Sequence, residues 1–449
     1  MPIPSILSPN WHFELSHLFL RGYDMRKNFK FFGTVTAVLS LVLSSTFVAT
    51  SSSSAADKKP SVINVYLIPS PSADAIKKLA PAWTAKTGIK VNFTEVEYGT
   101  AHQKALLSIQ TGKGEQDVVQ FDNTFLAAFA NAKALTALDS FTSASKEYDM
   151  ADFTPSLQHY GDFGGKKYGL MLSTEPFIQW YRSDIYKSLN LKPAKTWDEY
   201  KVNADAIQKS GKASGQLMGY GPNTTWWWMQ MVWSFGGSLY DSKFNPTVNS
   251  PQAIAATKFY KDLLSSAPKG ALGVNGDDVT TQFVSTNVGQ ILQYAGYASG
   301  VFDPKLSKNA KNIATAPAPS GKVNAIELAG WNIGIPSDSK NKTWAWSFLE
   351  YMLGKTNAPN FLNAGAAAIG RTSITTNKAL VAKNPYLALL SLPASATVYT
   401  YPSLVTWPEF DKVGSDGLAS ILSGKVTVEA GLQKLNQSLK VVLAKEPKH

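Results

Sequence analysis

The sequence predicts an α/β protein whose first part is built around a parallel sheet. Apolar, β-branched runs alternate there with segments whose apolar residues recur at helical spacing. The 449 residues also suffice for two domains, each with a core of its own. Strand–helix alternation is typical of a parallel sheet covered by helices. In chain order, we expect a strand over 61–70, a helix over 73–88, a strand over 89–98, a helix over 101–114 and a short buried strand over 117–122.

The boundaries of these elements point to a ligand-binding edge. Pro69 stops the first strand, and Gly88 ends the first helix. In open parallel sheets, ligands bind at the carboxyl ends of the strands. We therefore expect ligand contacts in the loops after Pro69, around Glu97–Tyr98 and at Asp122–Asn123.

The second part of the chain continues with helix signals. Thr196 is the expected N-cap of a helix, and Glu199 completes a capping box. One amphipathic helix begins at Ser250–Pro251, another ends at Gly354, and a last one covers residues 425–445. Because the sequence has no internal repeat and no proline-rich linker, we expect strands rather than a flexible tether between the domains.

Residues 1–56 are predicted to be a leader with a signal peptide. Met25–Lys30 is a basic segment, Phe31–Ala49 is uncharged and apolar, and the small residues up to Ala56 suit cleavage after that position. Met25 is then the expected true start. The alternative is an uncleaved anchor, because 19 uncharged residues can just span a bilayer.

Composition narrows the possible classes of protein. The sequence has no cysteine, which excludes disulfides, a thiol nucleophile and a lipoprotein anchor, so we expect a periplasmic or secreted product. The formal charge is +11, and about +9 remains without the leader, which carries four basic and two acidic residues. The sequence has no run of five or more basic residues, whereas a nucleic-acid binder usually concentrates its charge. We therefore expect no nucleic-acid partner.

Catalytic signals are weak. The three histidines after the leader lie far apart in sequence, no metal site or cofactor is predicted, and GxSxG and P-loop patterns are absent. The segment TGKGEQD follows a helix and is interpreted as a helix exit. A glycoside hydrolase needs two carboxylates, and Asp122, Glu175 and Glu409 are candidates without a known separation. A secreted carbohydrate-active enzyme is therefore the alternative function.

Several motifs occur in an order that resembles a known family. They include TGIKV, the segment KYGLMLSTEPFIQWYRSDIY, the aromatic block TTWWWMQMVWSFGG, NVGQILQYAGYASG, AGWNIGIPSDSKNKTWAWSFLEYMLG and SGKVTVEAGLQKL. Over Val62 to Leu435 the chain resembles the extracellular solute-binding proteins of sugar ABC importers, the family of the maltose-binding protein.

The resemblance implies a fold and a function. The fold is the two-lobed periplasmic-binding-protein fold (type II), in which each lobe is a mostly parallel sheet flanked by helices and hinge strands connect the lobes. A monosaccharide, oligosaccharide or polyol is held between the lobes, and closure presents the protein, likewise expected to be a monomer, to an ABC permease without chemistry on the ligand. The implied N-terminal lobe is 57–170 with 332–372, the C-terminal lobe is 175–328 with 375–449, and the hinges lie near 171–175, 328–332 and 371–375.

The resemblance also implies ligand-binding residues. Asp122 with Asn123 corresponds to an acidic corner, and Glu175 to an acidic residue at the first hinge. Arg371 is a candidate for bidentate binding, with pairing to a nearby acid as the equal alternative. Aromatic residues in family positions are Tyr297, where tryptophan is more common, Trp331 and Trp407.

The tryptophan block suits carbohydrate because sugar rings have apolar faces for stacking and a rim of hydroxyl groups. On a helix, Trp226 and Trp233 share one face, and Trp227 lies about 100° away. We expect one or two of Trp226, Trp227 and Trp228 to stack on the ligand and Trp233 to pack inside. A membrane role is disfavoured because no basic residue flanks the block. A non-sugar solute, such as a glycerol phosphodiester, is the remaining alternative on the same fold.

Overall fold

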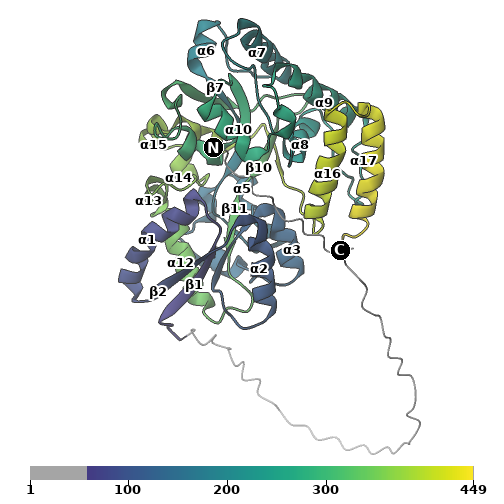
Figure 1. The fold of residues 1–449 in the computed structure, drawn as a ribbon. Helices are drawn as coiled ribbons and strands as arrows, with labels where there is room; N and C mark the ends of the chain where they lie inside the picture. The colour runs from purple at the N-terminus through teal and green to yellow at the C-terminus, as the bar shows by residue number, and fades with distance from the viewer. Residues whose placement is uncertain (1–57, 448–449) are drawn as a thin grey trace, which may run out of the picture. The chain divides into compact units, whose positions relative to one another are not determined.

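Two β-sheets organise the chain in the computed structural model, which describes residues 58–447 (Figure 1). The predicted leader, cleavage site and anchor alternative lie outside the described residues. No helix within 58–447 is long and apolar enough to cross a membrane.

The first lobe contains a five-stranded sheet in the order β2-β1-β3-β11-β6. The predicted strand–helix–strand–helix–strand start is confirmed, with Ser70 capping the first helix and Gly88 ending it in the left-handed conformation. Its strands are β1 (Val62–Leu67), β2 (Lys90–Glu95), β3 (Val118–Asp122), β6 (Leu170–Met171) and β11 (Trp331–Gly334), beside a small hairpin of β4 (Asp162–Phe163) and β5 (Lys166–Lys167). Its helices are α1 (Pro71–Thr87), α2 (Tyr98–Gln110), α3 (Leu126–Asn131), α4 (Asp139–Ala144), α5 (Pro155–Gln158), α12 (Lys342–Leu353) and α13 (Ala358–Asn363).

The second lobe is built on the strand order β12-β10-β7-β8, with β9 also paired to β7. Its strands are β7 (Glu175–Arg182), β8 (Gln290–Tyr294), β9 (Ile313–Pro317), β10 (Ala325–Ala329) and β12 (Thr397–Thr400). Its helices are α6 (Ser183–Ser188), α7 (Trp197–Ser210), α8 (Thr225–Ser234), α9 (Pro251–Asp262), α10 (Gly276–Ser285), α11 (Ala298–Val301), α14 (Thr372–Thr375), α15 (Lys378–Lys383), α16 (Trp407–Leu422) and α17 (Val428–Leu443).

Helix signals in the sequence are largely confirmed. Thr196 caps α7 by accepting from the Glu199 N–H, but the Glu199 carboxylate accepts from the Lys195 N–H instead of closing the box on Thr196. The closing helix α17 packs beside α16, and this pair lies against α8 and α9 (Figure 1).

Each of the two sheets is mostly parallel, as expected, but contains one strand of opposite direction. Strand β11 runs antiparallel to β3 and β6, and β7 runs antiparallel to β8, β9 and β10. The physical reason is that β7 and β11 each enter their sheet from the other lobe, whereas the remaining strands end at the edge where the lobes meet. The carboxyl ends of the other strands in each sheet therefore still share one edge.

The passages between the sheets are short and hydrogen-bonded. Residues 172–174 connect β6 to β7, and Gly330 alone connects β10 to β11. Gly330 has φ +147°, and a Cβ there would lie 2.4 Å from the Ser173 carbonyl oxygen, so only glycine fits. A later passage, after α13, lies beside the first: the Gly370 N–H donates to Thr174 Oγ1 at 2.7 Å. The lobe boundaries given above stay a prediction.

Candidate ligand-binding site

The carboxyl end of β3 carries the first part of the site. Asp122 is the last residue of β3 and lies opposite Trp331, the first residue of β11. The Tyr98 hydroxyl at the start of α2 donates to Asp122 Oδ2 at 3.2 Å, and the Tyr98 and Trp331 rings meet edge-on with centroids 5.8 Å apart. Tyr98 is 41% exposed and Trp331 is half-buried. Two aromatic rings and a carboxylate therefore share this edge and reach solvent.

The Asp122 carboxylate is fixed by its own turn. Its Oδ1 accepts hydrogen bonds from the N–H and the hydroxyl of Thr124 at 2.8 and 2.9 Å. Burial raises the pKa of Asp122, while the contacts with Thr124 and Tyr98 lower it. The Asp122 N–H donates to His102 Nε2 at 3.0 Å, and burial lowers the pKa of His102 to about 3. The neighbouring imidazole is thus neutral and leaves the carboxylate without a positive partner.

Glu175 adds a second carboxyl group at the start of β7. Its Oε1 accepts from the Ser173 hydroxyl at 2.5 Å. A Cβ on Gly296 would lie 2.3 Å from the Glu175 carboxyl carbon, so that glycine leaves the space the carboxyl group occupies. Burial raises the pKa of Glu175 to about 7, and the charge of Asp122 contributes to the rise. Glu175 and Asp122 therefore act on each other across the junction of the two lobes.

The second lobe supplies further aromatic rings. Trp226, in the first turn of α8, is half-buried and meets Tyr401 edge-on at 5.6 Å and Tyr294 at 6.3 Å. Tyr297 is also half-buried, and its hydroxyl donates to Asp277 Oδ1 at 2.5 Å. The negative charge of Glu175 is one of the causes that raise the pKa of Tyr297. Tyr297 is therefore associated with Glu175, and Trp226 with the rings of Tyr294 and Tyr401.

Asp411 on α16 is a site residue that the sequence analysis missed. Its Oδ1 accepts from the Thr225 hydroxyl. Burial raises the pKa of Asp411 to about 6; the Thr225 hydroxyl lowers it, as does the Trp226 indole N–H, which makes no well-aligned hydrogen bond. The charge of Asp411 also helps to raise the pKa of Tyr98 on the opposite lobe. The available signal was its position one helical turn after Trp407.

The assembled site is rich in aromatic rings and carboxyl groups. Rings of this kind stack on the C–H faces of a small ligand, while carboxylates accept hydrogen bonds from hydroxyl or amino groups. Within residues 58–447, no group of three or more His, Asp or Glu side chains is arranged to hold a metal ion. The geometry fits capture of a small polar molecule with apolar faces.

Comparison with protein families identifies the chain. Residues 69–359 match the model of the bacterial extracellular solute-binding proteins. The chain belongs to this family. A relative from Sinorhizobium fredii, named a probable amino-acid ABC transporter periplasmic-binding protein, is 23% identical over 286 residues, which is 62% of this chain and 65% of that relative. The match thus spans slightly less than two thirds of the relative's length.

Solved structures of ABC transporter solute-binding proteins share the fold. One from Agrobacterium radiobacter, in complex with ribitol, has a TM-score of 0.74 at 23% identity, covering 85% of this chain and 98% of that one. One from Agrobacterium vitis, with bound D-mannitol, has a TM-score of 0.71 at 26% identity, covering 86% and 100%. The two-lobed solute-binding fold is therefore that of this chain.

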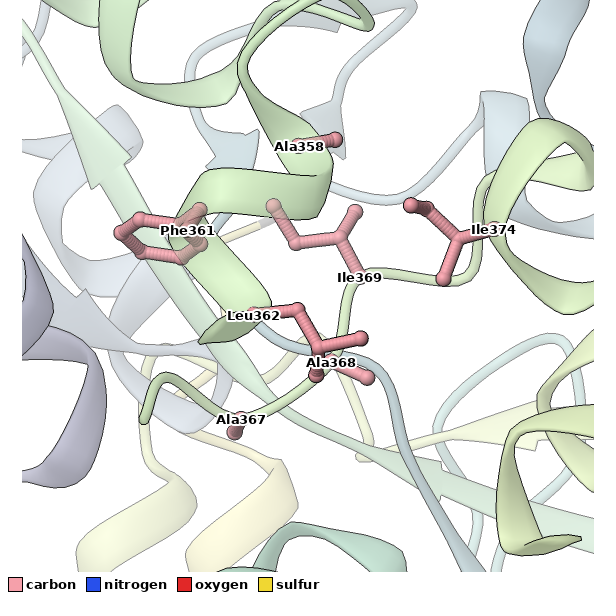
Figure 2. Close-up of a pocket in the computed structure, with 7 residues that line it drawn as sticks. All are labelled: Ala358, Phe361, Leu362, Ala367, Ala368, Ile369 and Ile374. Carbon is pink, nitrogen blue, oxygen red and sulfur yellow. The ribbon is translucent and has the colours of Figure 1, made fainter. Parts of the chain in front are cut away.

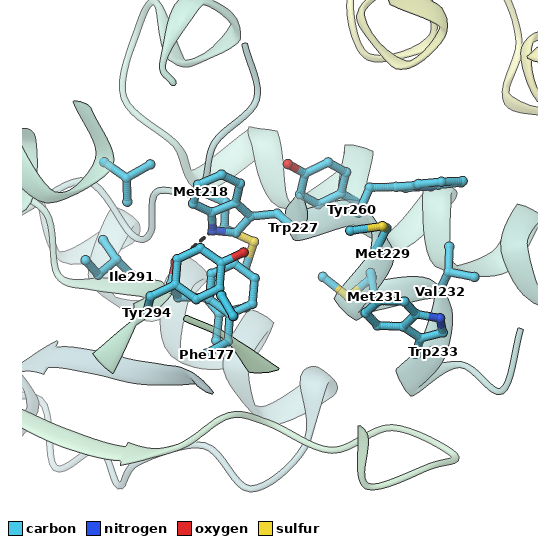
Figure 3. Packing of buried hydrophobic residues seen from close by; sticks show 14 of the residues in the cluster. Phe177, Met218, Trp227, Met229, Met231, Val232, Trp233, Tyr260, Ile291 and Tyr294 are labelled. Atoms are coloured by element: carbon cyan, nitrogen blue, oxygen red, sulfur yellow. Dashed lines mark hydrogen bonds between the residues drawn. The ribbon is translucent and has the colours of Figure 1, made fainter. Parts of the chain in front are cut away.

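The tryptophan block of this solute-binding protein divides between site and core. Figure 3 shows the core part, in which Trp227 and Trp233 lie among buried side chains. Trp227 is fully buried and donates to the Leu292 carbonyl oxygen at 2.8 Å, and Trp228 is fully buried and donates to Thr257. Trp233 stacks on Tyr399 at 4.7 Å, which agrees with the expected core position. The expectation that Trp227 contacts ligand is corrected, because helix α8 is packed on all sides except near its start.

Three other predicted residues do not line the site. Arg371 has no exposed surface: its guanidinium donates to the Leu353 and Tyr148 carbonyl oxygens and pairs with Asp152 at 3.3 Å, so the alternative of an acidic partner is correct. Trp407 is 3% exposed and packs beneath Tyr401. Asn123 is 8% exposed and accepts from Asn332, which ties β3 to β11. Arg371 therefore contacts no residue of the candidate site, whereas Trp407 and Asn123 contact neighbours of site residues.

Two hollows lie outside this group of residues. One of about 10 Å³ has only apolar lining: Ala358, Phe361, Leu362, Ala367, Ala368, Ile369 and Ile374 (Figure 2). A void of that size without polar partners stays dry. The other, of about 210 Å³, lies along α11 and α13 and has Ser299, Asp303, Asn363 and Asn384 in its wall. Neither contains the rings and carboxyl groups of the candidate site.

Proposed function

We propose that this solute-binding protein is the exported, substrate-binding component of an ABC importer for a sugar or polyol. The ligand, a monosaccharide, oligosaccharide or polyol, binds where the two lobes meet, and the loaded protein delivers it to a membrane permease. The leader predicted over residues 1–56 supports export to the periplasm or the medium. The protein acts as a monomer and leaves the ligand chemically unchanged.

The observation that carries this proposal is the alternation of rings and acceptors around the site. Tyr98 and Trp331 from the first lobe and Trp226 from the second are all accessible to solvent, and Asp122 and Asp411 lie beside them. A sugar or polyol presents apolar C–H surfaces together with many hydroxyl groups. Each hydroxyl group taken from water needs a partner, since an unpaired one costs about 1–3 kcal/mol.

The similar structures support the same class of ligand. The two proteins from Agrobacterium hold ribitol and D-mannitol, both of which are acyclic polyols. A phosphorylated ligand such as a glycerol phosphodiester needs arginine or lysine side chains, and Arg371 is fully buried in the first lobe. A neutral or cationic polyhydroxylated ligand therefore agrees best with the site.

A fluorescence titration tests the proposal. The purified protein is titrated with monosaccharides, disaccharides, trisaccharides and polyols, and thermal unfolding is followed in parallel. A true ligand at about 1,000 times its Kd adds roughly 4 kcal/mol to the free energy of unfolding. Trp226→Ala is expected to remove the fluorescence response, and Trp228→Phe, on the same helix but in the core, to keep it. If no compound of the panel changes the fluorescence or the thermal unfolding, the proposal is wrong.

The enzymatic alternative has its own measurement. A glycoside hydrolase with Asp122 and Glu175 as its acid pair would release reducing ends from a bound glycan. We expect each saccharide that shifts the fluorescence to be recovered intact after overnight incubation. Cleavage that disappears in Glu175→Gln would establish the enzyme instead.

A further inference from the structure

The candidate site carries negative charge without a positive counterpart. Asp122, Glu175 and Asp411 take part in none of the ion pairs formed within residues 58–447, and neither does the buried Glu327 on β10. Among residues 58–447, the ionisable nitrogen that contacts Asp122 is His102 Nε2, which accepts from the Asp122 backbone N–H and is neutral. Uncompensated carboxylates are costly to desolvate, so a ligand that closes this site has to supply their partner.

A second, independent observation is the Tyr160 hydroxyl. Tyr160 follows α5 and is 4% exposed, yet its hydroxyl has no hydrogen-bond partner. A Cβ on Gly330 would lie 3.0 Å from this oxygen, which places the hydroxyl at the passage between β10 and β11. The same passage leads to both acids: the Asn123 N–H, next to Asp122, donates to the Gly330 carbonyl oxygen, and Ser173, whose carbonyl oxygen also faces Gly330, donates its hydroxyl to Glu175. Burial is the main cause that raises the pKa of Tyr160, and the charges of Asp122 and Glu175 add to the rise. A buried, unpaired hydroxyl at the passage next to which both acids stand is an open acceptor for a ligand.

We propose that the natural ligand is a polyhydroxylated cation, an amino sugar or amino polyol, whose protonated amino group is held by Asp122, Glu175 and the Tyr160 hydroxyl. This rests on the proposed function and names its ligand class. An ammonium group has three donors and no acceptor, which matches two carboxylates and one hydroxyl oxygen. Charge-assisted hydrogen bonds of this kind are about twice as strong as neutral ones.

Other charge types fit the site less well. A neutral sugar donates hydroxyl hydrogens to the carboxylates but leaves their charges uncompensated. A zwitterionic amino acid also brings a carboxylate, and no arginine or lysine of residues 58–447 is paired with the acids of the site to receive it. The same gap excludes uronic acids and sugar phosphates. The aromatic rings of Tyr98, Trp226 and Trp331 add attraction for a cation through their faces.

The pH dependence of this preference follows from the groups that face the two acids. Glu175 is faced by the Ser173 hydroxyl, Tyr160, Tyr297 and Asp122. Asp122 is faced by Tyr98, Thr124, neutral His102, Tyr160 and Tyr401. None of these is a cation. Protonation of the acids at low pH therefore removes the attraction for an amine and leaves that for a hydroxyl group nearly unchanged.

The experiment compares matched pairs of ligands that differ only by an amino group in place of one hydroxyl group. The pairs are D-glucosamine with D-glucose, D-galactosamine with D-galactose, and 1-amino-1-deoxysorbitol with sorbitol. Affinities of the purified protein are measured by calorimetry at pH 8 and pH 5. We expect the amine of at least one pair to bind tenfold or more tightly than its partner at pH 8. At pH 5, where Glu175 is protonated, we expect this preference to be smaller.

Variants assign the preference to the named groups. Asp122→Asn and Tyr160→Phe are expected to reduce the amine preference at least threefold, with unfolding curves recorded to establish that they fold. Asp198→Asn removes an exposed acid of α7 outside the site and is the matched control, expected to keep the preference.

The outcomes separate this inference from the proposed function. If the hydroxyl member binds as tightly as the amine in every pair that binds, the cationic ligand class is wrong and the sugar- or polyol-binding function stands. If neither these pairs nor the wider saccharide panel binds, the proposed function fails together with the inference.

Discussion

Replacing Glu175 by glutamine should stabilise the ligand-free protein at pH 8 and have little effect at pH 5. The Glu175 carboxyl group receives one hydrogen bond, from Ser173, and lies near the negative charge of Asp122. Burial therefore raises its pKa from the ordinary value of 4.5 to about 7 in the folded chain. Glutamine has the shape of the protonated carboxyl group and cannot ionise.

The magnitude follows from the difference between the two pKa values. One pKa unit corresponds to 1.36 kcal/mol, so a rise from 4.5 to about 7 makes ionisation cost at most about 3 kcal/mol of folding free energy. Because the pKa of Glu175 is higher in the folded state, the stability that protonated Glu175 gives the folded chain is fully present below pH 4.5. It is lost progressively as the pH rises toward 7, and the penalty is constant above that value.

Urea unfolding of both proteins at pH 5 and pH 8 measures this difference. We expect Glu175→Gln to exceed the wild type by about 2–3 kcal/mol at pH 8 and by less than about 1 kcal/mol at pH 5. Glu409→Gln is the matched control, because Glu409 is exposed on α16 and pairs with Lys445. Equal effects of Glu175→Gln at the two pH values, or a loss of stability at pH 8, would refute the argument from burial.

Three further substitutions test the placement of individual residues. Arg371→Met leaves buried acceptors unpaired and should lower the free energy of unfolding by about 3–5 kcal/mol, measured by chemical unfolding. The Kd for a saccharide, measured by calorimetry, should not change. A loss of affinity without a loss of stability would place Arg371 in the site. Gly296→Ala puts a methyl group 2.3 Å from the Glu175 carboxyl carbon and should weaken ligand binding tenfold or more. In the same titration the Gly300→Ala variant should bind normally, because no other atom lies within 4 Å of the added methyl group. Trp227→Ala should cost about 3–5 kcal/mol of stability measured by thermal unfolding, and a stable variant with weakened binding would place this indole in the site.

Local signals in the sequence were sufficient for most elements of the first lobe. The helix that ends at Gly88 and the buried strand that ends at Asp122 both depend on short-range features, namely glycine's access to positive φ and an uninterrupted apolar run. The edge of the sheet that holds Tyr98 and Asp122 followed from the carboxyl-end rule for parallel strands. The direction of β7 could not be predicted from these local signals, because it depends on the lobe from which the strand enters its sheet.

The candidate site was predictable only in part, for a similar reason. Asp122 and Glu175 stand at strand ends, where the chain position alone suggests a role. Asp411 and Tyr160 lie on segments with no such signal, and only the docking of α16 and α5 beside the site brings them near it. Arg371 shows the converse, since a residue type suited to ligand binding is instead enclosed by backbone carbonyl groups.

By itself, the sequence determined the α/β class, the motif order of a solute-binding protein and a supply of aromatic and acidic residues suited to a polar ligand; the export leader stays a prediction. Only the tertiary structure decided which of those residues reach solvent. Trp226 and Trp227 are adjacent and chemically identical, yet one is half-buried at the site and the other is fully buried against Leu292. Burial of a side chain depends on what packs over it, and the covering elements come from distant parts of the chain.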